Sequence, residues 1–405
     1  MSVHVVGCDG APLRPEAAAA LGRAGLVVGA RRHLDAVAVP AGARVVVMGE
    51  VTAALDALAR HDGDAVVLAS GDPGFFGIVR RLRDRGLPVV VHPGVSSVAL
   101  AAARAGLPWD DLTVVSAHGR DPRAALAVVR SGVACVVLTD AVTGPAQVAA
   151  AAPPTARVVV CERLGGDGER VVDLPAAQVP ATGWHEPNVV VVDPRPAPPA
   201  PAAPVRIAGR PQSSGRAADW ALPEDAFEHR DGMVTKAEVR AWALARLGPR
   251  PGRVVWDVGA GSGSVAVECA RLGAAVVAIE RDPHQCARIR ANAAAHAVHV
   301  DVVEGAAPAA LAALPPADAV FVGGGGLDVL AAVAACRPAV VVVALAALDR
   351  VAPAVQLLRA AAFAVDGVQL AASRLADLPG GSLRLAALNP VTVLTGTAPD
   401  VQELP

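Results

Sequence analysis

Short apolar runs alternate with stretches in which apolar residues recur every three or four positions, and this alternation extends over most of the chain. The short runs predict buried strands, and the longer stretches predict helices. Strands that alternate with helices indicate parallel α/β sheets. In the first half of the chain the predicted strands are residues 3–6, 45–48, 65–69, 89–92, 112–115, 134–139, 157–161 and 189–192.

The second half repeats the pattern but ends differently. No helical stretch separates the last two apolar runs, so we expect them to form an antiparallel hairpin at the edge of the sheet. The longest apolar run, 339–348, is too short to span a membrane, and we expect a buried strand that leads into a loop. The predicted strands are residues 254–258, 275–279, 298–303, 319–322, 339–344, 361–368 and 383–393.

A Pro/Ala tract interrupts the alternation near the middle of the chain. Six prolines fall within residues 194–204, and a polar stretch rich in Gly and Ser follows. Such a tract cannot pack a core and behaves as a semi-rigid spacer. The chain has 405 residues, a length that favours two domains. We therefore predict domains at 1–193 and 217–405, joined by a linker at 194–216.

Composition narrows the class of partner. The formal net charge is -2 and aromatic residues make up 2% of the chain, so we expect no nucleic-acid partner. Six cysteines occur without a CxxC pair, which indicates buried thiols in a reducing compartment and no metal site. The N-terminus lacks the basic segment and apolar run of a signal peptide. We expect a cytoplasmic protein with no membrane partner.

A glycine-rich run follows the first predicted strand of the second half. A helical stretch at 265–272 comes directly after the run, and the next predicted strand ends in Glu280. Glycines let backbone approach a ligand closely, and a helix N-terminus favours negative groups. A carboxylate at a strand tip can accept hydrogen bonds from a ribose, so this order predicts the nucleotide end of a doubly wound sheet. The acid and the three glycines of the run are Asp257, Gly259, Gly261 and Gly263.

The spacing of this run selects among ligands. A dinucleotide site would need Gly or Ala at the last position, where this chain has Ser264. An acid in front of Gly-x-Gly-x-Gly resembles the first motif of the class I S-adenosylmethionine methyltransferases. The resemblance implies that Asp257 and the glycines surround the amino-acid end of the methyl donor. A dinucleotide, or a glycine-rich turn without a ligand, is the alternative.

Two further segments of the second half bear on the same site. Residues 227–236 lead into a predicted helix at 237–247, with Thr235 as N-cap and Glu238 completing a capping box. This segment either only starts the helix or folds over the donor, in which case Thr235 belongs to the donor site. Four glycines, residues 323–326, end the fourth predicted strand. At the ligand crevice they could admit a bulky flat substrate beside the methyl group or form an anion-binding turn, and the alternative is a loop without contacts. We assign Gly323 and Gly324 to the donor site.

Two glycine-and-serine turns follow neighbouring strands of the first half. One spans residues 70–77 and the other spans residues 93–97. The carboxyl ends of parallel strands meet at one edge of a sheet, so we expect both turns to line one small-molecule site. The residues that we assign to this site are Gly71, Asp72, Pro73, Gly94, Ser96 and Ser97.

These turns resemble the class III tetrapyrrole methylases, which act on uroporphyrinogen and the precorrins. The motifs at 109–110, 116–120, 138–140 and 161–166 extend the resemblance to the cobalamin-pathway family that methylates C5. In the second half, residues 227–236, the glycine-rich run, the four glycines and Leu388-Asn-Pro-Val391 resemble the decarboxylating C15 methyltransferases.

Together the resemblances imply an α/β chain of two folds. An N-terminal two-part class III tetrapyrrole methylase fold would be joined by the Pro/Ala-rich linker to a C-terminal doubly wound class I methyltransferase domain. They imply S-adenosylmethionine-dependent methylation of precorrin-6Y at C5 and C15, with decarboxylation of the C12 acetate, to give precorrin-8. The implied partner is a small-molecule tetrapyrrole, and the C-terminal type often assembles into homo-oligomers.

One loop departs from the class III pattern. Members of that class usually carry Gly-x-Gly-Pro-Gly after the first strand, close to the tetrapyrrole. This chain has Gly7-Cys-Asp-Gly10-Ala-Pro12 there, so two glycines remain and the Pro-Gly end is missing.

The implied substrate carries several carboxylates, so Arg and His side chains should line its site. Electron-rich ring carbons need no strong base to attack a methyl donor, which agrees with the lack of a compelling catalytic dyad in the sequence. The candidates are His229, Arg230, Arg374 and Arg384 in the second domain, and His118 and Arg120 in the first.

Two other readings stay open. One is a class I methyltransferase that acts on RNA or protein and carries an accessory N-terminal domain. The other is a non-enzymatic module in the N-terminal half that binds a tetrapyrrole or the donor. Near-neutral charge and scarce aromatics count against the first of these.

Overall fold

The computed structural model describes residues 2–49, 51–75, 77–194, 220–230 and 234–399. The chain forms two compact units, one of Met1–Pro122 with Val133–Ala200 and one of Arg123–Gly132 with Pro201–Pro405. Apart from Pro194, the predicted linker at 194–216 lies outside the described residues. The domain limits at 193 and 217 therefore stay a prediction.

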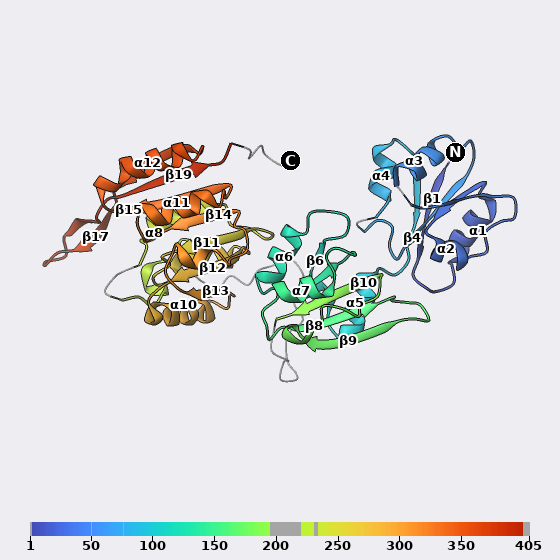
Figure 1. Ribbon diagram of the computed structural model, residues 1–405, viewed down its shortest axis with the longest axis horizontal. Helices are drawn as coiled ribbons and strands as arrows, with labels where there is room; N and C mark the ends of the chain where they lie inside the picture. The colour runs from blue at the N-terminus through green and yellow to red at the C-terminus, as the bar shows by residue number, and fades with distance from the viewer. Residues whose placement is uncertain (1, 50, 76, 195–219, 231–233, 400–405) are drawn as a thin grey trace. The chain divides into compact units, whose positions relative to one another are not determined.

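The first unit begins with a parallel five-stranded sheet in the order β3-β2-β4-β1-β5, drawn in blue in Figure 1. Its strands are β1 (Val3–Cys8), β2 (Leu26–Gly29), β3 (Arg44–Val47), β4 (Ala65–Ser70) and β5 (Val89–His92). Apolar residues of α1 (Pro15–Arg23) and α2 (Arg31–Asp35) pack on one face of the sheet. Those of α3 (Val51–Ala59) and α4 (Val79–Asp84) pack on the other. The loops that follow β1, β4 and β5 share one edge, as expected for parallel neighbours.

A second five-stranded sheet completes this unit, in the order β6-β7-β10-β8-β9. The β6–β7 pair is parallel, whereas the β7–β10, β10–β8 and β8–β9 pairs are antiparallel. The prediction of a parallel sheet is therefore wrong here, because the described residues between β8 and β10 contain no α-helix to carry a crossover. The strands are β6 (Thr113–Ser116), β7 (Cys135–Leu138), β8 (Arg157–Glu162), β9 (Arg170–Pro175) and β10 (Asn188–Asp193), and the helices are α5 (Ser97–Ala105), α7 (Pro145–Ala151) and the short 3-10 turns η1 (Trp109–Asp111) and η2 (Ala176–Gln178).

The second unit contains a seven-stranded sheet in the order β13-β12-β11-β14-β15-β19-β16. Strands β11 to β15 run parallel, and β19 lies antiparallel between β15 and β16. The strand order reverses between β11 and β14, and ligands bind at such a switch point in doubly wound sheets. The strands are β11 (Val254–Val258), β12 (Ala275–Glu280), β13 (Asp301–Glu304), β14 (Ala319–Val322), β15 (Val340–Leu345), β16 (Ala364–Leu370) and β19 (Val391–Thr397).

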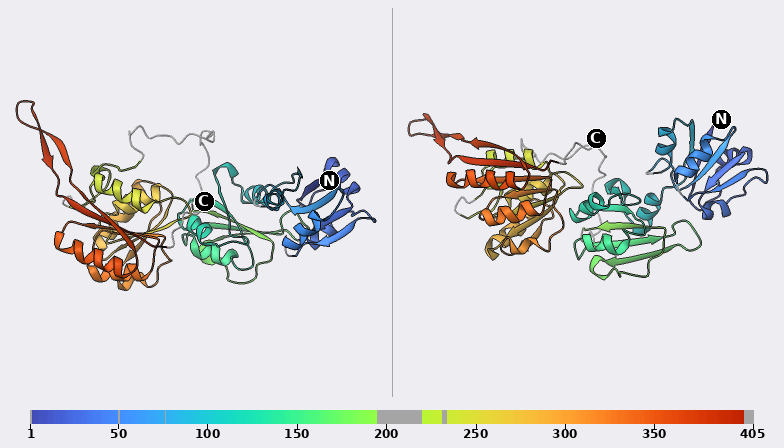
Figure 2. Two further views of the ribbon diagram at one scale, coloured as in Figure 1. Left: turned by 90° about the horizontal axis from the view of Figure 1, so that it is seen from above. Right: turned by 45° about the horizontal axis from the view of Figure 1, so that its top comes forward.

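Helices cover both faces of this sheet (Figure 2). Apolar residues of α8 (Ala237–Leu247), α9 (Ser264–Arg271) and α10 (Pro283–Ala295) pack on one face. Those of α11 (Leu327–Ala335) and α12 (Val351–Ala360) pack on the other. Successive residues of β11 point to opposite faces, and Val255 joins the first core while Trp256 joins the second. The remaining elements are α6 (Arg123–Arg130), η3 (Glu224–Ala226), η4 (Ala309–Leu311) and η5 (Leu348–Arg350).

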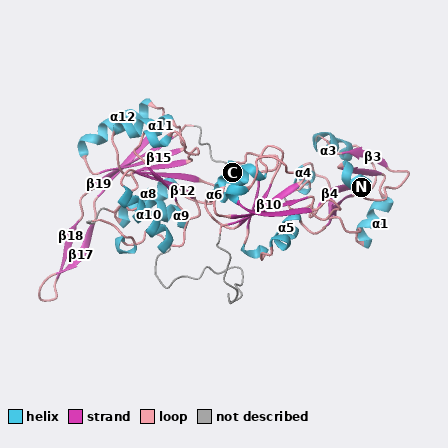
Figure 3. Cartoon of the chain, turned by 60° about the horizontal axis from the view of Figure 1, so that its bottom comes forward, coloured by secondary structure: helices cyan, strands magenta, loops and turns pink. Residues whose placement is uncertain are grey.

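The C-terminal edge corrects one prediction. The expected hairpin exists, since β16 pairs antiparallel with β19. The predicted strand at 383–393 is nevertheless two elements, because Pro390 lacks an N–H group and restricts the residue before it. Its first part is β18 (Leu383–Ala387), which pairs with β17 (Ser373–Asp377) in a separate two-stranded ribbon. This ribbon projects from the seven-stranded sheet (Figure 3).

Three smaller expectations can also be compared with the structure. The apolar run at 339–348 forms β15 and then a loop, as predicted. Within the described ranges, no helix is both long enough and apolar enough to cross a membrane. Four of the six cysteines are buried, but Cys8 is half-buried and Cys336 is exposed, so the expectation of buried thiols is wrong for Cys336.

Candidate functional site

In the second unit, the two glycine runs lie against each other at the carboxyl ends of β11 and β14. Gly259 has a positive φ of 70°, and a Cβ atom there would lie 2.8 Å from the backbone of Gly324. The Gly323 amide donates to the Val258 carbonyl at 3.0 Å. A side chain at Gly259 would therefore push the two runs apart. Whether residues 323–326 contact a ligand stays a prediction.

The other two glycines of the run shape the start of α9. Gly263 has a φ of 74°, and a Cβ there would meet the Ile289 side chain at 2.9 Å. Gly261 also has a positive φ, of 57°, but a Cβ there would meet nothing within 4 Å. Gly261 therefore leaves open space next to the helix N-terminus, where a ligand can approach the backbone.

Two acids flank this loop. Asp257 is buried at 1% exposure, and its Oδ2 accepts a hydrogen bond from the Ala266 amide at 2.9 Å. Its Oδ1 is buried and finds no partner among the described residues. Burial raises the pKa of Asp257 to about 7; the Ala266 hydrogen bond opposes this rise, and the nearby Glu280 charge adds to it. Glu280 Oε2 accepts from the Gly261 amide at 2.9 Å, which fixes the acid at the tip of β12.

These features fit an S-adenosylmethionine donor. The orphaned Oδ1 of Asp257 is an acceptor that a cationic or N–H-bearing group can satisfy. The Glu280 carboxylate accepts from the backbone amides of Gly261, Arg281 and Asp282, and a ribose diol could replace these donors. Asp257, Gly259, Gly261, Gly263, Glu280, Gly323 and Gly324 are thus gathered at one edge of the sheet, and their role in donor binding stays a prediction.

Three loops of the first unit meet in the same way. A Cβ atom on Gly7, in β1, would overlap with the carbonyl oxygen of Gly71 and the amide of Gly94. The Gly94 amide donates to the Gly71 carbonyl at 3.3 Å. Asp9 Oδ2 accepts from the Val95 amide at 2.7 Å and so ties the first loop to the third. The two turns predicted to line one site are therefore brought together by backbone contacts.

The altered first loop is not loose. A Cβ atom on Gly10 would overlap with the carbonyl oxygen of Gly165, and one on Gly165 would overlap with that of Asp9. Gly10 and Gly165 have φ angles of 90° and 79°. The loop that lacks Pro-Gly therefore packs tightly on the segment after β8.

Two predicted site side chains are used locally. Ser96 is the N-cap of α5, and its hydroxyl accepts from the Ala99 amide at 3.2 Å. Asp72 Oδ1 accepts from the Gly74 amide at 2.8 Å and shapes the second turn. Ser97 begins α5 and is half-buried, whereas Pro73 is buried. These contacts leave mainly backbone groups for a ligand at this point.

A cavity of about 800 Å³ lies beside the second turn in the first unit. Its volume is in the range of small-molecule sites. The predicted residues His118 and Arg120 line it, and so do residues that the sequence did not single out. The basic residues of its lining are Arg32, His33, Arg80, Arg81, Arg83, His118 and Arg120, with Asp84 as the one acid among the residues of the cavity wall.

A polar cluster stands in this cavity. Ser70 Oγ accepts a hydrogen bond from Arg32 Nη2 at 3.0 Å and lies 3.2 Å from His33 Nε2. Burial, with the Arg32 charge adding to it, lowers the pKa of His33 to about 4. His33 is therefore neutral at pH 7, and Arg32 supplies the charge for an anionic ligand. The sequence did not reveal this pair because only the fold brings Arg32 and His33, on α2, next to Ser70 at the end of β4.

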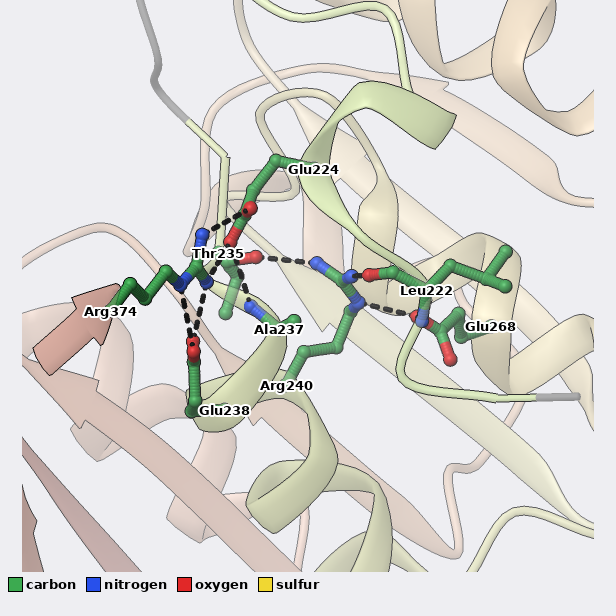
Figure 4. A network of polar contacts seen from close by, with 8 residues as sticks. All are labelled: Leu222, Glu224, Thr235, Ala237, Glu238, Arg240, Glu268 and Arg374. Carbon is green, nitrogen blue, oxygen red and sulfur yellow. Dashed lines mark hydrogen bonds and ion pairs between the residues drawn. The ribbon is translucent and has the colours of Figure 1, made fainter. Parts of the chain in front are cut away.

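The segment before α8 differs from the prediction. The N-cap of α8 is Lys236, and no side chain caps it, so the capping box of Thr235 and Glu238 is wrong. Instead, Glu224 Oε1 accepts from the Ala237 amide at 3.0 Å and satisfies a first-turn donor. The Thr235 carbonyl accepts from Arg240 Nη1 at 2.5 Å (Figure 4). Thr235 therefore acts through its backbone in this network.

Arg374 lies in the same network, on β17. Its guanidinium binds Glu238 at 2.7 and 2.9 Å and Glu224 at 2.8 Å through two nitrogens (Figure 4). Two glutamates already occupy this arginine, so it holds β17 to η3 and α8. A role for Arg374 in binding the substrate stays a prediction that would require these pairs to open.

The other predicted substrate residues are spread over two elements. His229 is half-buried, and its Nδ1 has no hydrogen-bond partner among the described residues. Arg230 is exposed beside it, and residues 231–233 lie outside the described residues. Arg384 is exposed on β18, opposite Ala376. The structure therefore does not bring these three and Arg374 together around one point.

Comparison with known proteins bears on both units. A model of tetrapyrrole (corrin/porphyrin) methylases matches residues 7–180, and a model of the precorrin methyltransferase domain matches residues 225–394. A precorrin-6Y C(5,15)-methyltransferase [decarboxylating] from Sinorhizobium sp. is 37% identical over 346 residues, which cover 81% of this chain and 79% of the relative.

Shorter relatives match less than half of the chain. A probable cobalt-precorrin-6B C(15)-methyltransferase (decarboxylating) from Pyrobaculum calidifontis is 37% identical over 44% of this chain and 95% of its own length. A cobalt-precorrin-7 C(5)-methyltransferase from Salmonella typhimurium is 34% identical over 44% of this chain and 91% of its own length. With two family models in tandem and a relative of matching length, the chain belongs to the precorrin-6Y C(5,15)-methyltransferase (decarboxylating) family.

Proposed function

We propose that this chain methylates precorrin-6Y at C5 and C15 and removes CO2 from the C12 acetate, giving precorrin-8 in cobalamin biosynthesis. We assign C5 methylation to the first unit, and C15 methylation with decarboxylation to the second. The observation that carries the proposal is that each half gathers glycine turns at the carboxyl edge of its own parallel sheet. Each half thus has a site where a small molecule can contact backbone.

S-adenosylmethionine supplies an electrophilic methyl group on a sulfonium, and the new C–C bond forms as the C–S bond breaks. The residues of the chain therefore have to align two reactants and exclude water rather than activate a nucleophile. In the second unit, Asp257 and Glu280 would fix the two ends of the donor against the glycine loop. A buried carboxylate near a sulfonium is also favourable because the local dielectric constant is low.

The acceptor carries carboxylates, and the cavity of the first unit is suited to them. Arg32 and Arg120 offer planar guanidinium groups that pair with carboxylates in a bidentate manner. Ser70 and the neutral His33 add hydrogen-bonding groups near Arg32 without a second fixed charge. We propose that this cavity holds the acetate or propionate side chains of the macrocycle while C5 faces the donor turns.

We also propose that the protein is a homo-oligomer. Leu375, Leu383 and Leu385 share one face of the β17–β18 ribbon, at 60–70% exposure each. The alternation of side chains along a strand turns Arg374 toward the body of the unit and its neighbour Leu375 away from it. An apolar face of this kind on a projecting ribbon is suited to contact with a second copy.

The function is tested with the full chain, labelled S-adenosylmethionine and precorrin-6Y. We expect a product that has gained two methyl groups and lost CO2, as measured by mass spectrometry. In the Glu280→Ala variant we expect one methyl group and no loss of CO2, because only the donor site of the second unit is damaged. Asp366→Ala, an exposed acid on β16 that contacts Arg246 at the surface, is the matched control and should behave like wild type.

Three other results would contradict parts of the proposed function. Decarboxylated product from Glu280→Ala would contradict the division of labour between the units. No methyl transfer by the wild-type chain would contradict the enzymatic function and favour a binding module. Transfer to RNA or protein, but not to precorrin-6Y, would contradict the substrate.

A further inference from the structure

Asn292, on α10, connects two segments that are far apart in the sequence. Its side chain is buried at 3% exposure. Its Oδ1 accepts from the Glu228 amide at 2.7 Å, and its Nδ2 donates to the carbonyls of Glu228 at 2.9 Å and Ser262 at 2.8 Å. Both N–H groups and the oxygen are therefore used, and all three bonds go to backbone. Ser262 lies within the glycine loop, between Gly261 and Gly263.

The segment that Asn292 holds is also fixed at its other end. We call residues 222–230 the leading segment. Glu268 of α9 forms a fully buried ion pair with Arg240 at 2.5 Å and accepts from the Leu222 amide at 2.9 Å. Arg240 also donates to the Leu222 carbonyl (Figure 4). The start of the leading segment is therefore part of the core of the unit and does not depend on Asn292.

The region near Glu228 has fewer such anchors. The ring of Phe227 is buried and contacts the ring of His296, with 5.1 Å between centroids. Beyond it, the Glu228 carboxylate lies 3.5 Å from Arg288, a loose pair with a largely exposed acid. Asn292 accepts one hydrogen bond from the Glu228 amide and donates another to its carbonyl, and so fixes the backbone there. The next residue, His229, has a buried ring nitrogen.

The same side chain also steadies the glycine loop. Glu280 holds this loop through the Gly261 amide, and a donor ribose would take that carboxylate under the proposed function. The bond from Asn292 to the Ser262 carbonyl uses the neighbouring peptide and a different acceptor, so it can persist when Glu280 changes partner. One buried amide thereby sets the distance between the glycine loop and the leading segment.

We propose that Asn292 is a positioning residue for methyl transfer in the second unit. It fixes the position of the leading segment relative to the glycine loop. The side of the donor site that includes His229 is therefore already in place when the donor binds. The inference rests on the proposed donor site at Asp257 and Glu280. It assigns Asn292 no contact with the donor or the substrate.

The test is calorimetric titration of the full chain with S-adenosylmethionine. The full chain has one proposed donor site in each unit. The part of the binding heat that is absent in the Glu280→Ala variant identifies binding to the second unit. Asn292→Asp has nearly the same shape but loses both N–H donors and sets a carboxylate against two carbonyl oxygens. We expect it to weaken donor binding at the second site about tenfold or more and to leave the first site unchanged. Asn292→Ala, which adds no charge, is the second variant if Asn292→Asp does not fold.

A control separates positioning from general stability. Val333→Ala removes buried methyl groups from α11, on the opposite face of the sheet, and should destabilise the unit while leaving donor affinity unchanged. Trypsin cleavage after the exposed Arg230 provides a second readout. We expect faster cleavage there in Asn292→Asp than in Val333→Ala at equal unfolding free energy.

The outcomes separate this inference from the proposed function. Wild-type donor affinity at the second site of Asn292→Asp would overturn the inference and leave the function standing. Equal weakening by Val333→Ala would also overturn it, because the effect would then follow stability alone. No donor binding by the wild-type chain would overturn the proposed function itself.

Discussion

At the residue scale, the central feature of the second unit is a buried acid with one unsatisfied oxygen. Asp257 has one hydrogen bond, from Ala266, and its other oxygen has no partner among the described residues. A buried carboxylate that lacks partners favours the protonated form. The acid motif therefore costs stability in the free protein, and the cost can be offset when a cationic ligand binds.

This cost predicts a pH dependence. The pKa of Asp257 is raised from 3.8 to about 7 in the folded state, so the folded state keeps a proton that the unfolded chain releases. The contribution to stability is complete below about pH 4 and is lost as pH rises to about 7. Between these pH values the wild type should lose on the order of 1.4 kcal/mol of unfolding free energy for each pH unit because of Asp257. Asp257→Asn lacks the titrating group, so it should not show this loss and should be more stable than wild type at pH 8. It should also bind S-adenosylmethionine more weakly.

Urea unfolding at pH 5, 6, 7 and 8 measures the effect. The transition of the second unit can be assigned from the variant Val333→Ala, which alters that unit alone. If wild type and Asp257→Asn lose stability in parallel between pH 5 and pH 8, the buried acid is not the cause.

The residues of the candidate sites differ in how far the sequence alone reveals them. The acid and glycines were predictable because the backbone geometry of a strand–turn–helix joint dictates their spacing, from Asp257 to Gly263. Asn292 and Arg32 were not, because their partners lie at distant positions that only the fold brings near. No spacing rule connects Asn292 with Glu228, which is 64 positions away.

At the element scale, the ribbon β17–β18 is held by charge rather than by an apolar core. Arg374 binds Glu224 of η3 and Glu238 of α8. Hydrogen bonding to Arg374 lowers the pKa of Glu224 to about 2, and Arg374 likewise lowers the pKa of Glu238. Three elements that are distant in the sequence therefore meet at one guanidinium.

This cluster predicts acid sensitivity. A carboxyl group whose folded-state pKa is depressed contributes stability above its unfolded pKa of about 4.5, and the contribution is lost as pH falls to about 2. Arg374→Met should remove about 1 kcal/mol at pH 7, since the cluster is partly solvent-screened, and should flatten the pH dependence between 4.5 and 2. Arg384→Met, an exposed arginine on the neighbouring strand, is the control.

Urea unfolding of the second unit at pH 3 and pH 6 checks this. We expect a smaller difference between the two pH values in Arg374→Met than in wild type or Arg384→Met. Equal differences in all three proteins would mean that the cluster does not contribute to stability.

Prediction of elements succeeded best where a run is apolar and buried on both faces, as in β11 and β12 of the seven-stranded sheet. It failed for β2, although Leu26–Gly29 is apolar and buried. It also failed for β9, whose Arg170, Asp173 and Pro175 interrupt the apolar residues and whose positions are exposed or half-buried. The ribbon strand β17 alternates exposed and half-buried positions and likewise carries little signal. Antiparallel pairing of β8, β9 and β10 could have been inferred only after β9 was found.

At the scale of the whole molecule, the exposed ribbon face sets the expected assembly. Leu375 stands directly opposite Leu385, and Leu383 continues the same face. We expect the variant with all three leucines changed to Ser to be a monomer where the wild-type chain is an oligomer, as measured by light scattering after gel filtration.

Leu348→Ser is the matched control, because Leu348 is exposed at 70% and belongs to η5 rather than to the ribbon. This variant should keep the assembly of the wild type. A wild-type chain that is monomeric at micromolar concentration, or a triple variant that still assembles, would refute an interface at the ribbon.

The close contact of Gly10 with Gly165 has a consequence for how this chain can change over time. Neither position has room for even one methyl group while the other backbone stays in place. A substitution of Gly10 or Gly165 therefore requires a change in the backbone of the other loop, so the two loops are expected to change together in evolution. The first loop of this chain, although it lacks the Pro-Gly of Gly-x-Gly-Pro-Gly, is thus closely fitted to the loop around Gly165. Anyone who transplants it into a relative, or randomises it in a library, has to move the loop around Gly165 with it.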